Sequence, residues 1–223
     1  MQKSRLQKAF WQKVLQDRQE ASVCFWKENQ RQILRWTIAF VQQVMIENWT
    51  GKILISTPKM GYDSEFSNSV ILLYEESAEH VAGLIVNKPT TIKTKKIFEV
   101  KGFKEIEMND PVYSGGPVNR DSIIILHSDE WKCGNTLSLN NGFNLTSDTQ
   151  MMKKFALKDK PKHFRFFNGL SLWSPGQLEG EIESKCWLVG DLTDPDLILK
   201  TPPRKQYLKA VELLGSQQMS KYL

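Results

Sequence analysis

The sequence is poor in the residues that most often carry chemistry or cross-link a fold. It has three cysteines and three histidines among 223 residues. Cys24, Cys133 and Cys186 are odd in number, far apart and form no CxxC pair, so the pattern predicts neither a disulfide framework nor a zinc site. No histidine stands at a metal-ligand spacing from another histidine or a cysteine. We therefore expect no metal, no cofactor and a cytoplasmic protein in a reducing compartment.

Long apolar runs are missing as well. The longest apolar-looking stretch, residues 33–46, is too short and too interrupted by polar side chains to span a bilayer. Met1 is followed by mixed polar and aromatic residues rather than by the unbroken apolar core of a secretory signal. The sequence therefore predicts neither a transmembrane segment nor a secretory leader.

Glycine and proline are absent from residues 1–49, where apolar side chains at Ile33, Trp36, Phe40 and Val44 recur at helical spacing. This pattern predicts an N-terminal helical extension over 1–49, followed by a single domain over 50–223. The extension would pack on the domain or on another subunit, or alternatively lie on a membrane surface. A start at Met45 is a further alternative.

Excess charge of one sign is confined to that extension. Of 30 basic and 25 acidic side chains, residues 1–49 hold eight and four, which leaves 22 and 21 for the remainder. A nearly neutral domain gives little support to nucleic-acid binding, which needs a concentrated basic field. One basic cluster would attract nucleic acid or an acidic partner, unless it is only a solvated loop, and it comprises Lys153, Lys154, Lys158, Lys160, Lys162 and Arg165.

From residue 50 on, short apolar runs alternate with turns. They predict strands at 51–57, 68–76, 82–88, 110–118, 122–128, 163–173 and 185–190, with a turn through Ser77–His80 between the second and the third. A helix is expected at 145–157, capped by Ser147 and with Met151, Met152 and Phe155 facing inward. Another is expected at 201–215, capped by Gly215. In the second helix the expected buried face is Tyr207, Leu208, Val211 and Leu214. Strands in irregular order with few helices predict an α+β fold with a curved, mostly antiparallel sheet.

The stretch "SLWSPGQLEGEIESKCW" resembles an active-site loop but has the signals of a helix start. Ser174 is the expected N-cap, Pro175 the first helical residue, and Gln177 completes a capping box. Trp173 and Leu178 are spaced to close a hydrophobic staple over the cap. We therefore expect a helix over 175–184 with an architectural role.

Other candidate motifs predict little catalytic chemistry. In "LHSDE" (126–130), adjacent residues cannot fold onto one another as a catalytic triad, so His127 is expected to be a hydrogen-bonded structural residue. "SGGPV" (114–118) would suit an anion-binding nest, but a tight turn that requires positive φ is favoured. "DLTDPD" (191–196) lacks the glycine and the closing glutamate of a calcium loop.

Five ordered blocks point to a known family. They are "GKILISTPKMGYDSEFSNSVILLYEE", "GLIVNKPT", "DPVYSGGPV…IIILH", "FFNGLSLWSPGQLEGEIESKCWLV" and "DPDLILKTPPRKQYLKAVELLG". Over residues 51–215 the chain resembles the bacterial YqgE/AlgH family. The resemblance implies one α+β domain whose bifurcated sheet curls into a pseudo-barrel with flanking helices. It also implies a cytoplasmic protein without an established activity, in a family that often carries a transcriptional-regulator label.

Three hypotheses for the function follow. The leading one is a non-enzymatic, regulatory protein that binds a protein partner or forms a homo-oligomer. The second is a small-ligand binder or enzyme with a pocket near the Gly115–Gly116 turn, in which seven residues of the matching blocks converge: Asn87, Ser114, Gly115, Gly116, His127, Trp173 and Gln177. The third is DNA binding through the lysine cluster and the basic N-terminus, which steep salt dependence would reveal.

Overall fold

The computed structural model describes residues 48–61, 65–103, 106–139 and 142–220. The chain divides into two compact units, Met1–Asn48 and Trp49–Leu223, and the fold described below is that of the second unit. The expected N-terminal helix and its contacts with a membrane or a subunit lie outside the described residues.

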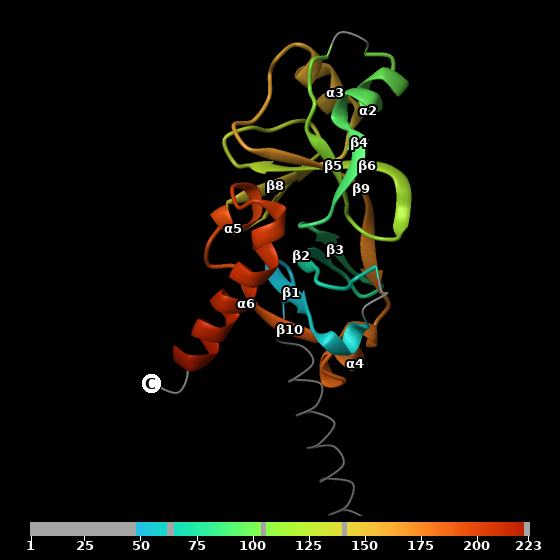
Figure 1. The fold of residues 1–223 in the computed structure, drawn as a ribbon. Coiled ribbons are helices and arrows are strands. Elements are labelled where there is room, and N and C mark those ends of the chain that lie inside the picture. Colours follow the sequence, from blue (N-terminus) through green and yellow to red (C-terminus); the bar gives the residue numbers. More distant parts are fainter. Residues whose placement is uncertain (1–47, 62–64, 104–105, 140–141, 221–223) are drawn as a thin grey trace, which may run out of the picture. The chain divides into compact units, whose positions relative to one another are not determined.

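The second unit is built on one large sheet (Figure 1). The main path of the sheet runs in the order β10-β1-β2-β3-β9-β6-β8-β7, and β4 pairs with β5, which in turn pairs with β9. All of these pairs are antiparallel except β5 with β9. The strands are β1 (Lys52–Ser56), β2 (Val70–Glu76), β3 (Val81–Ile85), β4 (Pro89–Lys93), β5 (Pro111–Ser114), β6 (Val118–Ser128), β7 (Thr136–Leu139), β8 (Phe143–Thr146), β9 (Phe164–Trp173) and β10 (Trp187–Asp191).

Strand β9 divides the sheet into two halves. Its last residues pair with β3, in the register Val81↔Trp173, while its first residues pair with both β5 and β6. Gly169, at φ +71°, lies between the two stretches, where a side chain would meet the backbone of Gly116. This branching confirms the predicted α+β fold with a curled, half-barrel sheet.

Helices cover different parts of this sheet. In Figure 1, α2 (Thr94–Val100) and α3 (Thr149–Ala156) lie together at one end, and α4 (Gln177–Glu183) lies at the other. Helices α5 (Asp196–Leu199) and α6 (Pro203–Ser220) lie beside each other, and a short 3₁₀ helix, η1 (Pro58–Met60), follows β1.

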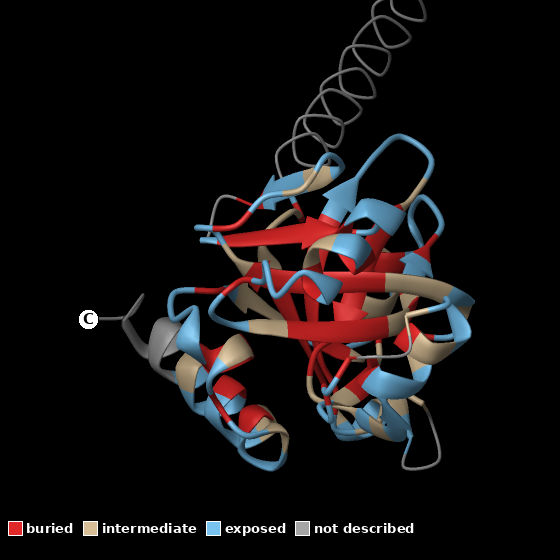
Figure 2. Cartoon of the chain, turned by 90° about the horizontal axis from the view of Figure 1, so that it is seen from above, coloured by how far each residue is buried: buried red, intermediate tan, exposed pale blue. Residues whose placement is uncertain are grey.

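The core consists of three apolar clusters, because alternate residues of a strand point to opposite faces. Ile53 and Ile55 of β1 join Phe167 of β9 and the buried side of α5 and α6 in the first cluster. On the opposite face, one cluster gathers under α2 and α3 and another gathers around α4. Figure 2 shows these buried strands at the centre, with exposed segments around them.

The three helices expected from the sequence form, but their ends differ from the predictions. Asp148, rather than Ser147, caps α3 by accepting a hydrogen bond from the Met151 N–H at 2.7 Å. Helix α4 begins at Gln177 behind a left-handed Gly176, because residues 174–177 form a turn. The Ser174 N–H nevertheless donates to Gln177 Oε1, as in one half of the expected capping box.

Helix α6 departs most from its prediction. It continues through Gly215 to Ser220, so this glycine is not its cap. Leu208 and Val211, which were expected on its buried face, are exposed. The buried face contains Ala210 and Leu214 together with Gln206, whose amide donates to the carbonyls of Leu197 and Ile198. A buried polar side chain therefore set the rotation of this helix.

Candidate functional site

An open cleft of about 460 Å³ lies between the loop after α2, the start of α3 and strand β6. We call it the α2–α3 cleft; it is lined by Lys101, Phe103, Asp121, Ser122, Ile123, Ser147, Asp148, Thr149, Met151, Met152 and Lys153. Two buried methionines and two half-buried residues, Phe103 and Ile123, supply its apolar surface. Its volume is within the range of ligand pockets, and methionine suits surfaces that adapt to different partners.

The sheet leaves a strand edge beside this cleft. Strand β8 pairs with β6 only from Ile125 to Ser128, and the chain then turns away into α3. The adjoining stretch of β6, residues 121–123, lines the cleft at a bulge, where the register with β9 shifts between Val118 and Ile123. It has no partner strand on the β8 side among the described residues. An unpaired strand edge can hydrogen-bond to an added strand.

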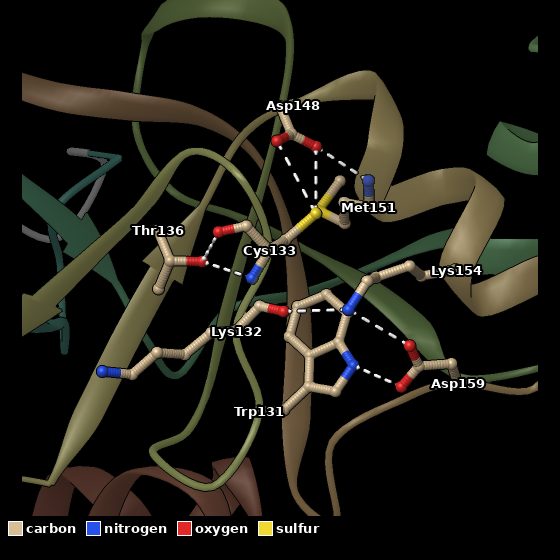
Figure 3. Close-up of polar contacts among 8 residues, drawn as sticks. All are labelled: Trp131, Lys132, Cys133, Thr136, Asp148, Met151, Lys154 and Asp159. Atoms are coloured by element: carbon tan, nitrogen blue, oxygen red, sulfur yellow. Dashed lines mark hydrogen bonds and ion pairs between the residues drawn. The ribbon is translucent and has the colours of Figure 1, made fainter.

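Asp148, which lines the cleft, contacts Cys133 behind the start of α3 (Figure 3), and we call these two residues the wall of the cleft. The Cys133 thiol donates to Asp148 Oδ1 at 3.5 Å, and the same carboxylate accepts from the Met151 and Asn135 N–H groups. Burial and the nearby Asp148 carboxylate raise the pKa of the Cys133 thiol. Because the thiolate is the nucleophilic form of cysteine, this arrangement disfavours the reactive form of Cys133.

A buried polar chain supports this wall. His127 Nε2 lies 3.0 Å from Thr146 Oγ1, which lies 2.8 Å from Thr136 Oγ1. Thr136 in turn accepts a hydrogen bond from the backbone of Cys133. Burial lowers the pKa of His127, whose ring packs edge-on against Trp131. His127 thus occupies the structural role that its position at the end of an apolar strand predicted.

The seven residues of the predicted pocket fall into three groups. Ser114, Gly115 and Gly116 lie at the end of β5, and Asn87 is near them because the Lys88 carbonyl accepts from the Ser114 N–H. Asn87 itself bonds to the backbone of Val70 and Asn68.

The second group is Trp173 with Gln177, which both donate to Glu181 of α4. His127 forms the third, with its threonines. None of the seven lines the α2–α3 cleft, so ligand binding by this set stays a prediction.

The glycine turn has the expected cause at one glycine and a second cause at the other. Positive φ is needed at Gly116, but at Gly115 the constraint is space, since an added Cβ would lie 2.2 Å from the Gly169 carbonyl oxygen. Two strands therefore cross at van der Waals distance, and only glycine fits between them.

The lysine cluster is smaller than the sequence indicated. Arg165 is 8% exposed and does not belong to it. Its guanidinium donates to the carbonyls of Val86 and Thr201 and to Gln206 Oε1, and it lies 4.8 Å from the Tyr113 ring. Arg165 lies between Phe164 and Phe166 in β9 and points to the face opposite theirs, where it fastens α6 to the sheet.

The lysines themselves remain at the surface. Lys154 pairs with Asp159 at 3.1 Å, donates to the Lys132 carbonyl and lies over the Trp131 ring (Figure 3). Lys153, Lys158, Lys160 and Lys162 are exposed, and Lys160 lies over Phe164. Lys154 is thus held by several intramolecular contacts and Lys160 by one, which weakens the cluster as a binding surface.

The described residues contain no group of three or more histidine, cysteine, aspartate or glutamate side chains suited to a metal ion. Within the same residues, the helices are too short or too polar to traverse a lipid bilayer. The sequence did not reveal the α2–α3 cleft, because its lining comes from three separate segments. The expectation that Met151, Met152 and Phe155 face inward from α3 was confirmed and was the available signal.

Comparison with known proteins agrees with this architecture. The chain matches the model of the AlgH-like family over residues 53–219. A UPF0301 protein of Cupriavidus pinatubonensis is 33% identical over 171 residues, which cover 75% of this chain and 89% of that protein. Another, from Ruegeria pomeroyi, is 34% identical over 170 residues, with 74% and 91% covered. The solution structure of the AlgH protein from Pseudomonas aeruginosa superposes with a TM-score of 0.63 at 25% identity, covering 73% of this chain and 86% of that one. The chain therefore belongs to the AlgH-like family.

Proposed function

We propose that the protein acts in the cytoplasm as a non-enzymatic binding protein, and that its α2–α3 cleft receives an extended segment of a partner protein. The observation that carries the proposal is the meeting of two features at one place. The cleft offers an apolar surface, and residues 121–123 of β6 offer a strand edge beside it. Strand addition supplies backbone hydrogen bonds, while a pocket for an alternate side chain supplies selectivity.

The reactive groups nearby support binding over covalent chemistry. The Cys133 thiol is hydrogen-bonded to Asp148, and the ring of His127 is buried against Thr146. Neither group is presented to the cleft as an activated nucleophile or base. A site that holds a segment of another protein suits a regulatory role, in which occupancy of the cleft is the signal.

The test uses one obstructing substitution and one matched control. Thr149 lines the cleft at the first turn of α3, and the adjacent Gln150 is also exposed but does not line it. T149W should fill the cleft. Q150W adds the same side chain to the same turn of the helix but outside the cleft, so it controls for the change of surface. Random peptides displayed on phage are selected in parallel on the wild-type, T149W and Q150W proteins.

We expect the same peptides to be enriched on the wild-type and Q150W proteins. T149W should raise their dissociation constants at least about tenfold. In the complex, amide exchange at residues 121–123 should slow, which a small apolar ligand in the cleft would not cause. Equal enrichment on all three proteins, or no enrichment on the wild type, would contradict the proposal. Affinity that falls steeply with salt would instead indicate a charge-driven contact with nucleic acid.

A further inference from the structure

A second polar cluster lies at the corner where β5 leads into β6. We call it the Glu65 corner; it consists of Glu65, Lys88, Ser114, Arg120 and Asn168. Arg120 Nη2 lies 2.9 Å from each carboxylate oxygen of Glu65. Ser114 Oγ donates to Glu65 Oε1 at 3.5 Å, and Lys88 Nζ donates to the Glu65 backbone carbonyl. One cation and one hydroxyl thus contact the Glu65 carboxylate, and a second cation, Lys88, is held at the backbone of the same residue.

Close backbone packing places these groups together. A Cβ at Gly116 would lie 2.4 Å from the Leu170 carbonyl, and one at Gly169 would lie 3.4 Å from Arg120 Cγ. The stem of Arg120 therefore runs across β9 beside Gly169, toward the end of β5 that bears Ser114. The close approach of the backbones at Gly116 and Gly169 therefore fixes the positions from which the side chains of the corner extend.

An unpaired buried atom belongs to the same corner. Asn168 is in register with Ser114 of β5 on one side and with Ile123 of β6 on the other, so the three side chains share one face of the sheet. Its Oδ1 is buried and accepts no hydrogen bond from the described residues. A buried acceptor without a donor destabilises a protein, which indicates that a donor from outside belongs there.

We propose that the Glu65 corner binds a small organic acid that carries an N–H or O–H donor beside its carboxylate, and that Glu65 takes the place of the ligand carboxylate when no ligand is bound. Arg120, Lys88 and Ser114 supply donors for a carboxylate, and Asn168 Oδ1 supplies the acceptor for the adjacent donor. The occupant is replaceable, because the Glu65 and Arg120 side chains are 34% and 60% exposed and an exposed ion pair contributes little to stability.

The charge of Lys88 fits this assignment. Burial lowers the pKa of the Lys88 ammonium, and the negative charge of Glu65 partly offsets that effect. A ligand carboxylate in place of Glu65 would supply the same compensation. The proposal is independent of the α2–α3 cleft, whose lining contains none of the five residues.

The experiment titrates the full-length protein with N-acetylglycine, which has an N–H next to its carboxylate, and with acetate and inorganic phosphate. NMR signals of the Asn168 side-chain amide and of the Gly115 backbone report binding. The variants are E65Q, which removes the competing carboxylate, and E65Q/R120Q, which also removes the cation. E99Q is the control for the change of charge, because Glu99 belongs to a separate exposed pair with Lys96.

We expect N-acetylglycine to bind E65Q at least about fivefold more tightly than it binds the wild type or E99Q. Acetate should bind E65Q several-fold more weakly than N-acetylglycine does, because acetate has no N–H to donate to Asn168. The double variant should lose binding, and T149W should not affect it. As a second measurement on the unaltered protein, saturating N-acetylglycine should shift the side-chain carboxyl signal of Glu65. Unchanged affinity in E65Q, or binding that survives E65Q/R120Q, would overturn the proposal. Phosphate binding without a change at Asn168 would overturn the assignment to organic acids.

Discussion

Glu181 provides the sharpest test of how α4 is held to the sheet. Its Oε2 accepts hydrogen bonds from the indole N–H groups of Trp173 at 2.9 Å and Trp187 at 2.7 Å, and its Oε1 accepts from the Gln177 amide. Both tryptophans are 3% exposed, so the substitution Glu181→Ala leaves two buried donors without an acceptor. An unsatisfied buried donor costs about 1–3 kcal/mol, and we expect a total loss of about 3–5 kcal/mol.

Urea unfolding followed by far-UV circular dichroism measures this loss. With a slope of about 2 kcal/mol per molar, the midpoint should fall by about 2 M. Glu181→Gln keeps one acceptor oxygen for both indoles but gives up the charge, so a smaller loss of about 1–2 kcal/mol is expected. Glu183→Ala is the matched control, since Glu183 is exposed on the same helix and should change stability by less than about 0.5 kcal/mol. If Glu181→Ala costs no more than this control, the indole clamp does not hold α4.

Three further predictions concern the wall of the cleft and the strand crossing. In a protein with Cys24 and Cys186 replaced by serine, Cys133 should be alkylated slowly at neutral pH and faster as pH rises above the usual thiol range. Asp148→Asn should move this dependence of the alkylation rate on pH to lower pH. An unchanged dependence would show that the carboxylate does not control the thiol. Because burial lowers the pKa of His127 in the folded state, its contribution to stability is present above the unfolded pKa of about 6.5 and is lost as pH falls below it. The urea midpoint should therefore drop between pH 7 and pH 5, by less in His127→Gln than in the wild type or the His163→Gln control, and equal drops in all three would contradict this. Gly115→Ala should destabilise the fold by more than about 2 kcal/mol, because its Cβ would clash with the Gly169 carbonyl. Gly180→Ala should stabilise α4 by about 0.5–1 kcal/mol in the same unfolding assay, since a side chain there meets nothing within 4 Å. The reverse order would show that the backbone relaxes at the crossing.

The elements that sequence reasoning identified are those with a strong local signal. Strands β2 and β3 are continuous apolar runs on both sides of the predicted turn at Ser77–His80. Helix α3 buries the three residues expected from its periodicity. Strand β4 and helix α2, by contrast, consist largely of polar or exposed residues, and β4 gains its order by pairing with β5. Elements of this kind have no pattern that a sequence alone discloses.

The errors in side-chain placement share one cause. Arg165 and Gln206 are polar, so the sequence places both at the surface, yet each is buried and they hydrogen-bond to each other at 3.0 Å. Such burial is stable only when carbonyl and amide partners converge from distant segments, here Val86 and Thr201. Because the sequence does not show this convergence, the predicted buried face of α6 omitted Gln206 and the predicted basic cluster wrongly included Arg165.

The sequence by itself determined the α+β class and the positions of the main strands along the chain, because apolar periodicity and turn residues act over a few neighbouring positions. The family followed from the resemblance of five ordered blocks. The tertiary structure alone decided where binding groups gather. The α2–α3 cleft needs α3 and the unpaired stretch of β6 at one place, and the Glu65 corner needs Arg120 and Asn168 on adjacent strands. Both arise because β9 pairs with β3 at one end and with β5 and β6 at the other, a long-range arrangement that no local pattern encodes.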